Sequence, residues 1–95
     1  MYLSFEQVAV DGTVKTASAL TIPANATGVE IQADTQAVQY TMDNVTAPTS
    51  SSGMQFLTTS EPRYFLIEDL KRIKFTQGAG GAGVLNIHYH AGRNV

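Results

Sequence analysis

The chain has 95 residues, a net charge of −2, and only 15% charged residues. This length predicts a single domain over 1-95 with a thin core, and the charge argues against binding nucleic acid phosphates or anionic lipids. Cysteine is absent, which excludes disulfides and thiolate metal sites. The first residues lack a signal-like pattern, and no stretch approaches the ~18 apolar residues of a membrane span. We therefore expect a soluble protein.

Strand-like composition begins at the N-terminus. Residues 2–10 form the first expected strand, and the turn signal Asp11-Gly12 follows it. A second strand, either continuous or broken in its middle, is expected over 14–22. Ala17, Ser18 and Ala19 weaken its alternation, and Pro23 ends the run.

The clearest alternation lies in the middle of the chain. Apolar residues occupy every second position over 29–33 and again over 38–42. Two such runs with a short break between them are typical of a β-hairpin. Residues 43–53 contain a single large apolar residue, which predicts the longest loop. Loops of this length in compact domains are usually functional or mobile.

The next segment is apolar and then charged. Residues 63–67 are dense in aromatic and aliphatic side chains, which favours a strand near the core, with Tyr64 on a core face. Residues 68–72 place acids before bases, as a helical turn does, but five residues cannot hold a helix alone. We expect one turn that buries Leu70.

The last third of the chain places two alternating runs around a glycine-rich segment. Residues 73–77 and 84–89 flank the six small residues 78–83, a pattern that predicts a second β-hairpin. Its buried face would carry Ile73, Phe75, Leu85, Ile87 and Tyr89. One buried and one wet face are the usual condition of an antiparallel sheet.

Together these segments predict the fold class. Seven or eight short strands with turn signals between them indicate an all-β protein, an antiparallel β-sandwich or small barrel. Meander connections are expected for most of them, because consecutive strands usually lie side by side.

Few residues are arranged for chemistry. His88 and His90 share one strand face, a spacing that chelates zinc or copper when a third ligand lies nearby, but two exposed histidines on a polar face are the favoured interpretation. A pair of carboxylates from among four acids could form a hydrolase site; these acids are Asp34, Asp43, Glu68 and Asp69. Their role as hydrogen-bond acceptors in turns is the better explanation of their positions. No serine sits in a Gly-x-Ser-x-Gly elbow, which argues against a Ser-His-acid triad. For these reasons we predict no catalytic residue, no metal and no cofactor.

Several turn and core motifs carry a resemblance. They are Ile22-Pro23-Ala24-x-Ala26-Thr27, Ile31-Gln32-Ala33, Val38-Gln39-Tyr40, Asp43 with Ala47-Pro48-Thr49, Gly53-Met54, Asp69-Leu70-x-x-Ile73-x-Phe75 and Leu85-Asn86-Ile87-x-Tyr89. In these the chain resembles small uncharacterised virion structural proteins of tailed bacteriophages. The resemblance implies a head decoration, head-to-tail or tail-associated protein, made in the host cytoplasm and located in the virion.

The resulting hypothesis is a non-enzymatic structural protein that self-associates, as a trimer or ring, and docks on a capsid or tail protein. A thin core, a surface of low charge and strand edges that need covering all favour association. The predicted contact residues lie in the two loops. They are Val45, Pro48, Thr49, Gly53, Met54, Gly78, Gly80, Gly81 and Gly83.

An alternative from another class is a small carbohydrate- or receptor-binding module. Tyr40, Tyr64 or Tyr89 would stack on a sugar face in such a module. Sugar platforms expose aromatic rings beside hydrogen-bonding groups, whereas all three tyrosines fall on expected core faces.

Overall fold

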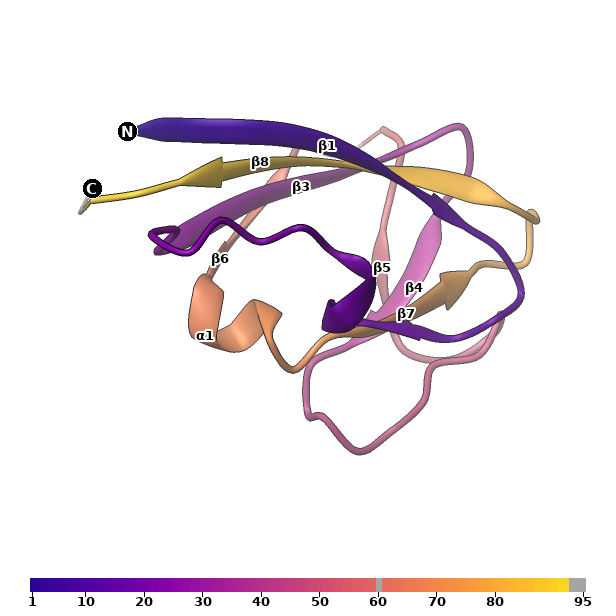
Figure 1. Cartoon of the computed structure of the whole chain (residues 1–95). Coiled ribbons are helices and arrows are strands. Elements are labelled where there is room, and N and C mark those ends of the chain that lie inside the picture. The colour runs from indigo at the N-terminus through magenta and orange to yellow at the C-terminus, as the bar shows by residue number, and fades with distance from the viewer. Residues whose placement is uncertain (60, 93–95) are drawn as a thin grey trace.

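The computed structural model describes residues 1–59 and 61–92, and it shows two four-stranded antiparallel sheets packed face to face (Figure 1). The strands are β1 (Tyr2–Val10), β2 (Lys15–Thr16), β3 (Gly28–Asp34), β4 (Val38–Thr41), β5 (Met54–Phe56), β6 (Arg63–Leu66), β7 (Lys74–Gln77) and β8 (Gly83–His90). A 3-10 turn, Ala17–Ala19, and one helix, α1 (Ile67–Leu70), complete the elements. The predicted antiparallel β-sandwich is confirmed.

The order of the strands differs from the expected meander. The first sheet, called sheet A here, has the order β1-β8-β3-β6, and the second, sheet B, has the order β2-β7-β4-β5. Among the strands that the structure describes, only β4 and β5 are neighbours both in sequence and in a sheet. The prediction of mostly meander connections is therefore wrong.

The two predicted hairpins are wrong for the same reason. β7 lies in sheet B and β8 in sheet A, and β3 and β4 are divided between the sheets in the same way. In each case the chain crosses from one layer to the other, as Figure 1 shows. A strand that buries one face has the same alternation in either sheet, so the pattern could not distinguish such an arch from a hairpin.

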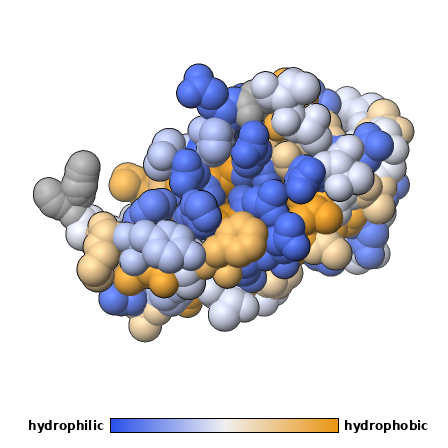
Figure 2. Space-filling view, turned by 90° about the horizontal axis from the view of Figure 1, so that it is seen from above, coloured by the Kyte–Doolittle hydropathy of each residue, from blue (hydrophilic) through white to orange (hydrophobic). Residues whose placement is uncertain are grey.

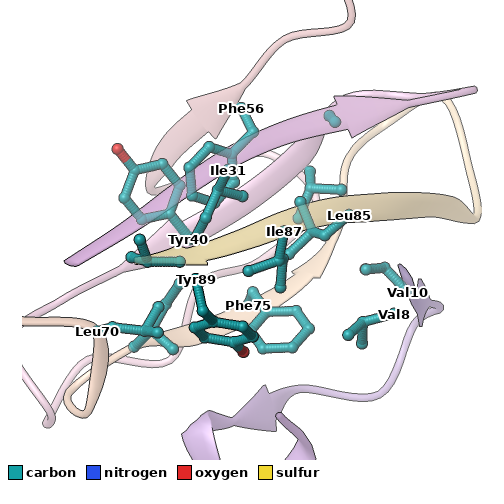
Figure 3. Packing of buried hydrophobic residues seen from close by; sticks show 14 of the residues in the cluster. Val8, Val10, Ile31, Tyr40, Phe56, Leu70, Phe75, Leu85, Ile87 and Tyr89 are labelled. Carbon is teal, nitrogen blue, oxygen red and sulfur yellow. The ribbon is translucent and has the colours of Figure 1, made fainter. Parts of the chain in front are cut away.

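The inner faces of the two sheets form one core (Figure 3). The buried face predicted for the last third is confirmed, because its five residues are all at most 1% exposed. An aromatic group lies at one side of the core: the rings of Tyr40 and Phe56 stack at 4.0 Å, and Phe65 meets both edge-on at 6.0 Å. Such pairs stabilise a core beyond the area that they bury.

The predicted second strand over 14–22 is largely wrong. Only Lys15–Thr16 is extended in a sheet, and Ala17–Ala19 forms the 3-10 turn, in which the Thr16 side chain accepts a hydrogen bond from the backbone N–H of Ser18. The small residues at 17–19 and the capping side chain of Thr16 favour a turn over pairing with a neighbouring strand. The chain then runs alongside β1, where the backbone N–H of Thr21 donates to Glu6 at 2.8 Å.

The same carboxylate reaches into the core. The hydroxyl of buried Tyr89 donates to Glu6 Oε2 at 2.5 Å. Burial, together with the hydrogen bond and charge of Glu6, raises the pKa of Tyr89 far above its ordinary value. A buried polar atom is thereby paired, as the interior of a small domain requires.

The expected helical turn over 68–72 is present as α1, which begins one residue earlier than predicted and ends at Leu70. Leu70 is fully buried, as expected, and Ile67 is buried beside it. Glu68 and Asp69 occupy the first turn of the helix, where their negative charges interact favourably with the free backbone N–H groups. Lys71 Nζ lies 3.7 Å from the Glu68 carboxylate.

Candidate functional site

The long loop between β4 and β5 is held by its own hydrogen bonds. Asp43 Oδ1 accepts from the backbone N–H groups of Val45 at 2.9 Å and Thr46 at 2.8 Å, and Oδ2 accepts from the Thr46 hydroxyl at 2.6 Å. The Thr41 hydroxyl donates to the Thr46 carbonyl, and Lys74 Nζ to the Val45 carbonyl. The interpretation of Asp43 as a turn residue is confirmed.

We expect the Asp43→Asn variant to lose less stability in acid than the unmodified protein. The hydrogen bonds from Thr46 and Val45, chiefly the one from the Thr46 hydroxyl, lower the pKa of Asp43 from 3.8 to about 2. Because the folded pKa is the lower one, the unfolded chain takes up the proton first, and stability falls as the pH drops from 3.8 to about 2. Urea midpoints measured above and within this range test the expectation. Equal losses for both proteins would contradict it.

The predicted contact residues of this loop differ in exposure. Val45 is 78% exposed and Met54 is 55% exposed, so both can touch a partner. Thr49 is exposed as well, but it is engaged within the loop, where it exchanges backbone hydrogen bonds with Ser52 and its hydroxyl lies 2.8 Å from the Ser52 hydroxyl. The loop therefore presents its apolar side chains from an ordered turn.

Two other predicted contact residues serve the loop itself. Pro48 is buried. Gly53 has a φ of +111°, and a Cβ added there would lie 3.0 Å from the Tyr40 carbonyl oxygen and 3.2 Å from Pro48 Cβ. A glycine is needed at this position for backbone reasons.

The glycine-rich segment forms an arch between the sheets rather than a hairpin tip. A Cβ added at Gly78 would lie 3.0 Å from the Ala37 carbonyl oxygen, one at Gly83 would lie 2.8 Å from the Gln36 carbonyl oxygen, and one at Gly80 would contact the Gln36 side chain. Gly78 and Gly83, which are predicted as contacts with a partner, thus pack closely against the chain's own 36–37 turn. Gly81 has a φ of +105°, and it is the one of the four at which an added Cβ would have no atom within 4 Å. Gly80 is exposed and Gly81 is half-buried.

A row of four side chains crosses the outer face of sheet A. The strand register aligns Phe5 of β1, His88 of β8, Glu30 of β3 and Tyr64 of β6. Glu30 Oε2 accepts from the Tyr64 hydroxyl at 2.9 Å, and Oε1 lies 3.2 Å from His88 Nδ1. Seen from above, this face mixes hydrophilic and hydrophobic side chains (Figure 2). We call Phe5, His88, Glu30 and Tyr64 the outer row.

Glu30 is a carboxylate at neutral pH. Burial acts to raise its pKa, but the hydrogen bonds from Tyr64 and His88 and the nearby imidazoles of His88 and His90 together lower it below its ordinary value. The hydrogen bond to Glu30 raises the pKa of Tyr64 in turn. The outer row therefore carries a fixed negative charge.

Glu30 is the third side chain that a metal site at His88 and His90 would need. Its Oε1 atom lies 3.7 Å from His90 Nε2, a buried nitrogen without a hydrogen-bond partner. Nevertheless, no group of three or more His, Cys, Asp or Glu side chains in residues 1–59 and 61–92 is placed to hold a metal ion. The acid and the imidazoles instead form a polar cluster on the sheet.

The tyrosines of the alternative hypothesis are placed differently from one another. Tyr40 and Tyr89 are buried and cannot stack on a ligand. Tyr64 is 70% exposed, so the expectation that it lies on a core face is wrong. In β6 the inward position belongs to Phe65, which packs against the aromatic group of the core.

The other candidate acids have local partners. Asp34 Oδ1 accepts from the backbone N–H of Thr35, which has a φ of +73° at the end of β3. Glu68 and Asp69 belong to the first turn of α1. This arrangement fits the turn chemistry that was favoured over a paired-carboxylate site.

Two hollows lie beside the outer row. The larger, of about 690 Å³, is mostly apolar and includes Met1, Thr27, Tyr64, Leu66 and His90 among its walls. The smaller, of about 300 Å³, lies over β1, β8 and β3 and is lined by Phe5, Gln7, Glu30, Gln32, Pro62, Asn86 and His88. The meeting of β1 and β8 side chains in this hollow was not predicted, because it depends on the pairing of two strands from opposite ends of the chain. The alternation over 29–33 did place Glu30 on an outer face.

Within the described part of the chain, no helix has the length and apolar character needed to span a membrane. No protein-family model, curated protein or solved structure matches this chain. Its function therefore has to be inferred from the surface of the molecule itself.

Proposed function

We propose that this chain is a non-enzymatic structural protein of a bacteriophage particle that associates with copies of itself and docks on a capsid or tail protein. The observation that carries the proposal is the presence of two separate groups of exposed hydrophobic side chains. The first, the β6 patch, consists of Met1, Tyr64 and Leu66 around the larger hollow. The second, the loop patch, consists of Val45 and Met54.

These side chains are more exposed than a solitary domain of this size needs. Met1 is 80% exposed and Leu66 is 67% exposed. Burying one such side chain fully is worth about 1.5–3 kcal/mol, so covering a patch stabilises a complex. Exposed apolar groups of this kind mark interaction surfaces on soluble proteins.

The arrangement of the patches suits a ring that also docks. The β6 patch belongs to sheet A, whereas Met54 lies on β5 at the edge of sheet B. Two unlike patches permit head-to-tail contacts, which close into rings when the rotation allows it. β6 is also an edge strand, and its free backbone groups can pair with a strand of another copy.

The remaining support comes from composition and resemblance. A chain with 15% charged residues offers a neutral surface that suits permanent packing. The turn and core motifs resemble virion structural proteins of tailed bacteriophages, and this resemblance supports a place in the particle.

Light scattering coupled to size-exclusion chromatography tests the association. We expect a mass that is a multiple of the 10.2 kDa chain, and a shift toward the monomer in the Leu66→Asp variant, because a charge in the β6 patch opposes its burial. Val14→Asp, at another exposed apolar position outside both patches, is the matched control and should keep the oligomer. A monomer at all concentrations would refute self-association.

A further inference from the structure

The smaller hollow on sheet A is lined by groups that suit a polar ligand. Its polar walls come from three adjacent strands, with Gln7 on β1, Asn86 on β8 and Glu30 and Gln32 on β3. Residues on sheet strands are held more firmly than residues on loops. A volume of about 300 Å³ is at the lower end of small-molecule sites, which is enough for a ligand the size of one sugar ring.

One wall of the hollow is an exposed aromatic ring. Phe5 is 49% exposed, although it belongs to the long strand β1. Its ring meets the His88 ring edge-on at 5.4 Å, and Tyr2 meets the same imidazole at 5.3 Å. The Phe5 ring therefore packs against His88 on one side and offers an apolar surface beside the hydrogen-bonding groups of the hollow.

The hydrogen-bonding groups are also held in place. Gln7 Nε2 donates to Asn86 Oδ1 at 2.9 Å, and Glu30 is positioned by Tyr64 and His88. Amide side chains combine donors and acceptors, and a carboxylate adds acceptors. Hydroxyl groups both donate and accept, so this set matches a polyhydroxylated molecule. Groups fixed before binding lose little freedom when the ligand arrives.

The charge of the hollow selects against anionic ligands. Among the described residues that line it, Glu30 and His88 are the only ionisable ones, and none is a lysine or an arginine. A phosphate or sulfate would meet the Glu30 carboxylate without a fixed positive partner. A neutral ligand avoids this unfavourable interaction.

We propose that this hollow binds one ring of a neutral saccharide. The apolar face of the sugar stacks on Phe5, and its hydroxyl groups bond to Gln7, Glu30 and Asn86. Sugars combine an apolar C–H face with a rim of hydroxyls, and the hollow presents the complement of both. The site is formed within one chain, so it does not depend on self-association or on a place in a phage particle.

Nuclear magnetic resonance titration of the full ¹⁵N-labelled chain tests the site. The probes are glucose, galactose, mannose and N-acetylglucosamine, with glucose 6-phosphate as the charged counterpart. We expect saturable shifts at the backbone amides of Phe5, Glu30 and Asn86 with at least one neutral sugar, and weaker binding of the phosphate. Oligomer state is measured separately, so a monomer that binds sugar would refute only the self-association.

Variants separate a saccharide site from general surface effects. Phe5→Leu keeps an apolar side chain but removes the ring, and we expect the affinity to fall about tenfold, the equivalent of a lost aromatic contact. Asn86→Ala is a second test from another strand and should also weaken binding. Val14→Ala, at an exposed apolar position outside the hollow and outside both patches, is the control and should bind as the unmodified chain does.

Three results would overturn the proposal. The first is that no neutral sugar gives a saturable shift. The second is that Phe5→Leu and Asn86→Ala, both folded by their spectra, bind as well as the unmodified chain. The third is that glucose 6-phosphate binds more tightly than glucose, since the Glu30 carboxylate is expected to repel it.

Discussion

Replacement of Phe56 by alanine is expected to lower the free energy of unfolding by about 3–5 kcal/mol. Phe56 is 1% exposed and stacks on Tyr40 (Figure 3). Phe65 lies edge-on to both rings. Removing its ring leaves a cavity beside two aromatic side chains that cannot close it without losing their own contacts. Domains of this size have total stabilities of roughly 5–15 kcal/mol, so this loss is a large fraction of the total.

Urea unfolding followed by circular dichroism measures this loss. Met54→Ala is the matched control, because Met54 lies on the same short strand, β5, but is mostly exposed. We expect the control to change stability by no more than about 0.5 kcal/mol. If both variants lost the same amount, the aromatic group of the core would not have the importance assigned to it.

Replacement of Gly83 by alanine is expected to cost about 1–3 kcal/mol. The new Cβ would lie 2.8 Å from the carbonyl oxygen of Gln36 and 3.3 Å from its Cβ. The nearest atom belongs to the backbone of a tight turn, so it cannot swing away as the end of a side chain does. The arch and the 36–37 turn would have to move apart, which would disturb the start of β8.

Gly12→Ala is the control for this substitution, because the added Cβ meets only the end of the Gln77 side chain, at 3.8 Å, and the backbone φ is not positive. There the change should stabilise the protein by about 0.4–1 kcal/mol through the unfolded chain. Thermal and urea unfolding of both variants give the comparison. Opposite signs are expected, and a Gly83→Ala variant as stable as the unmodified chain would show that the arch is loosely packed.

The sequence predicted the buried face of the clearly alternating strands, such as β3 and β8, but not of β6, and it did not predict which sheet a strand joins. Burial at every second residue over 29–33 and 85–89 follows from the two-residue period of a strand. Pairing depends on contacts between distant segments, such as Val10 with Gly83, and these leave no mark in a local pattern. Both predicted hairpins failed at this step. Their strands formed, but Gln39 and Thr76 are buried although the alternation places them on polar faces.

The candidate site was less predictable than the core. Tyr64 and Phe65 are adjacent and both aromatic, so composition cannot say which of them faces inward; the pairing of Glu30 with Tyr64 decides it. The outer row needs four strands in register, and the sequence offered no sign that Phe5 and His88 are neighbours. The glycines of 78–83 are predicted as contacts with a partner, whereas Gly78 and Gly83 give room to the backbone of the chain's own residues 36 and 37.

The place of β8 between β1 and β3 has a consequence for biosynthesis. β8 is the last described strand to leave the ribosome, so β1 and β3 emerge long before the segment that joins them. Until then their apolar faces and unpaired edges are open to other nascent chains, a state prone to aggregation. β1 can therefore join sheet A only in a late and slow step, after β8 has emerged, since pairings between distant segments form slowly.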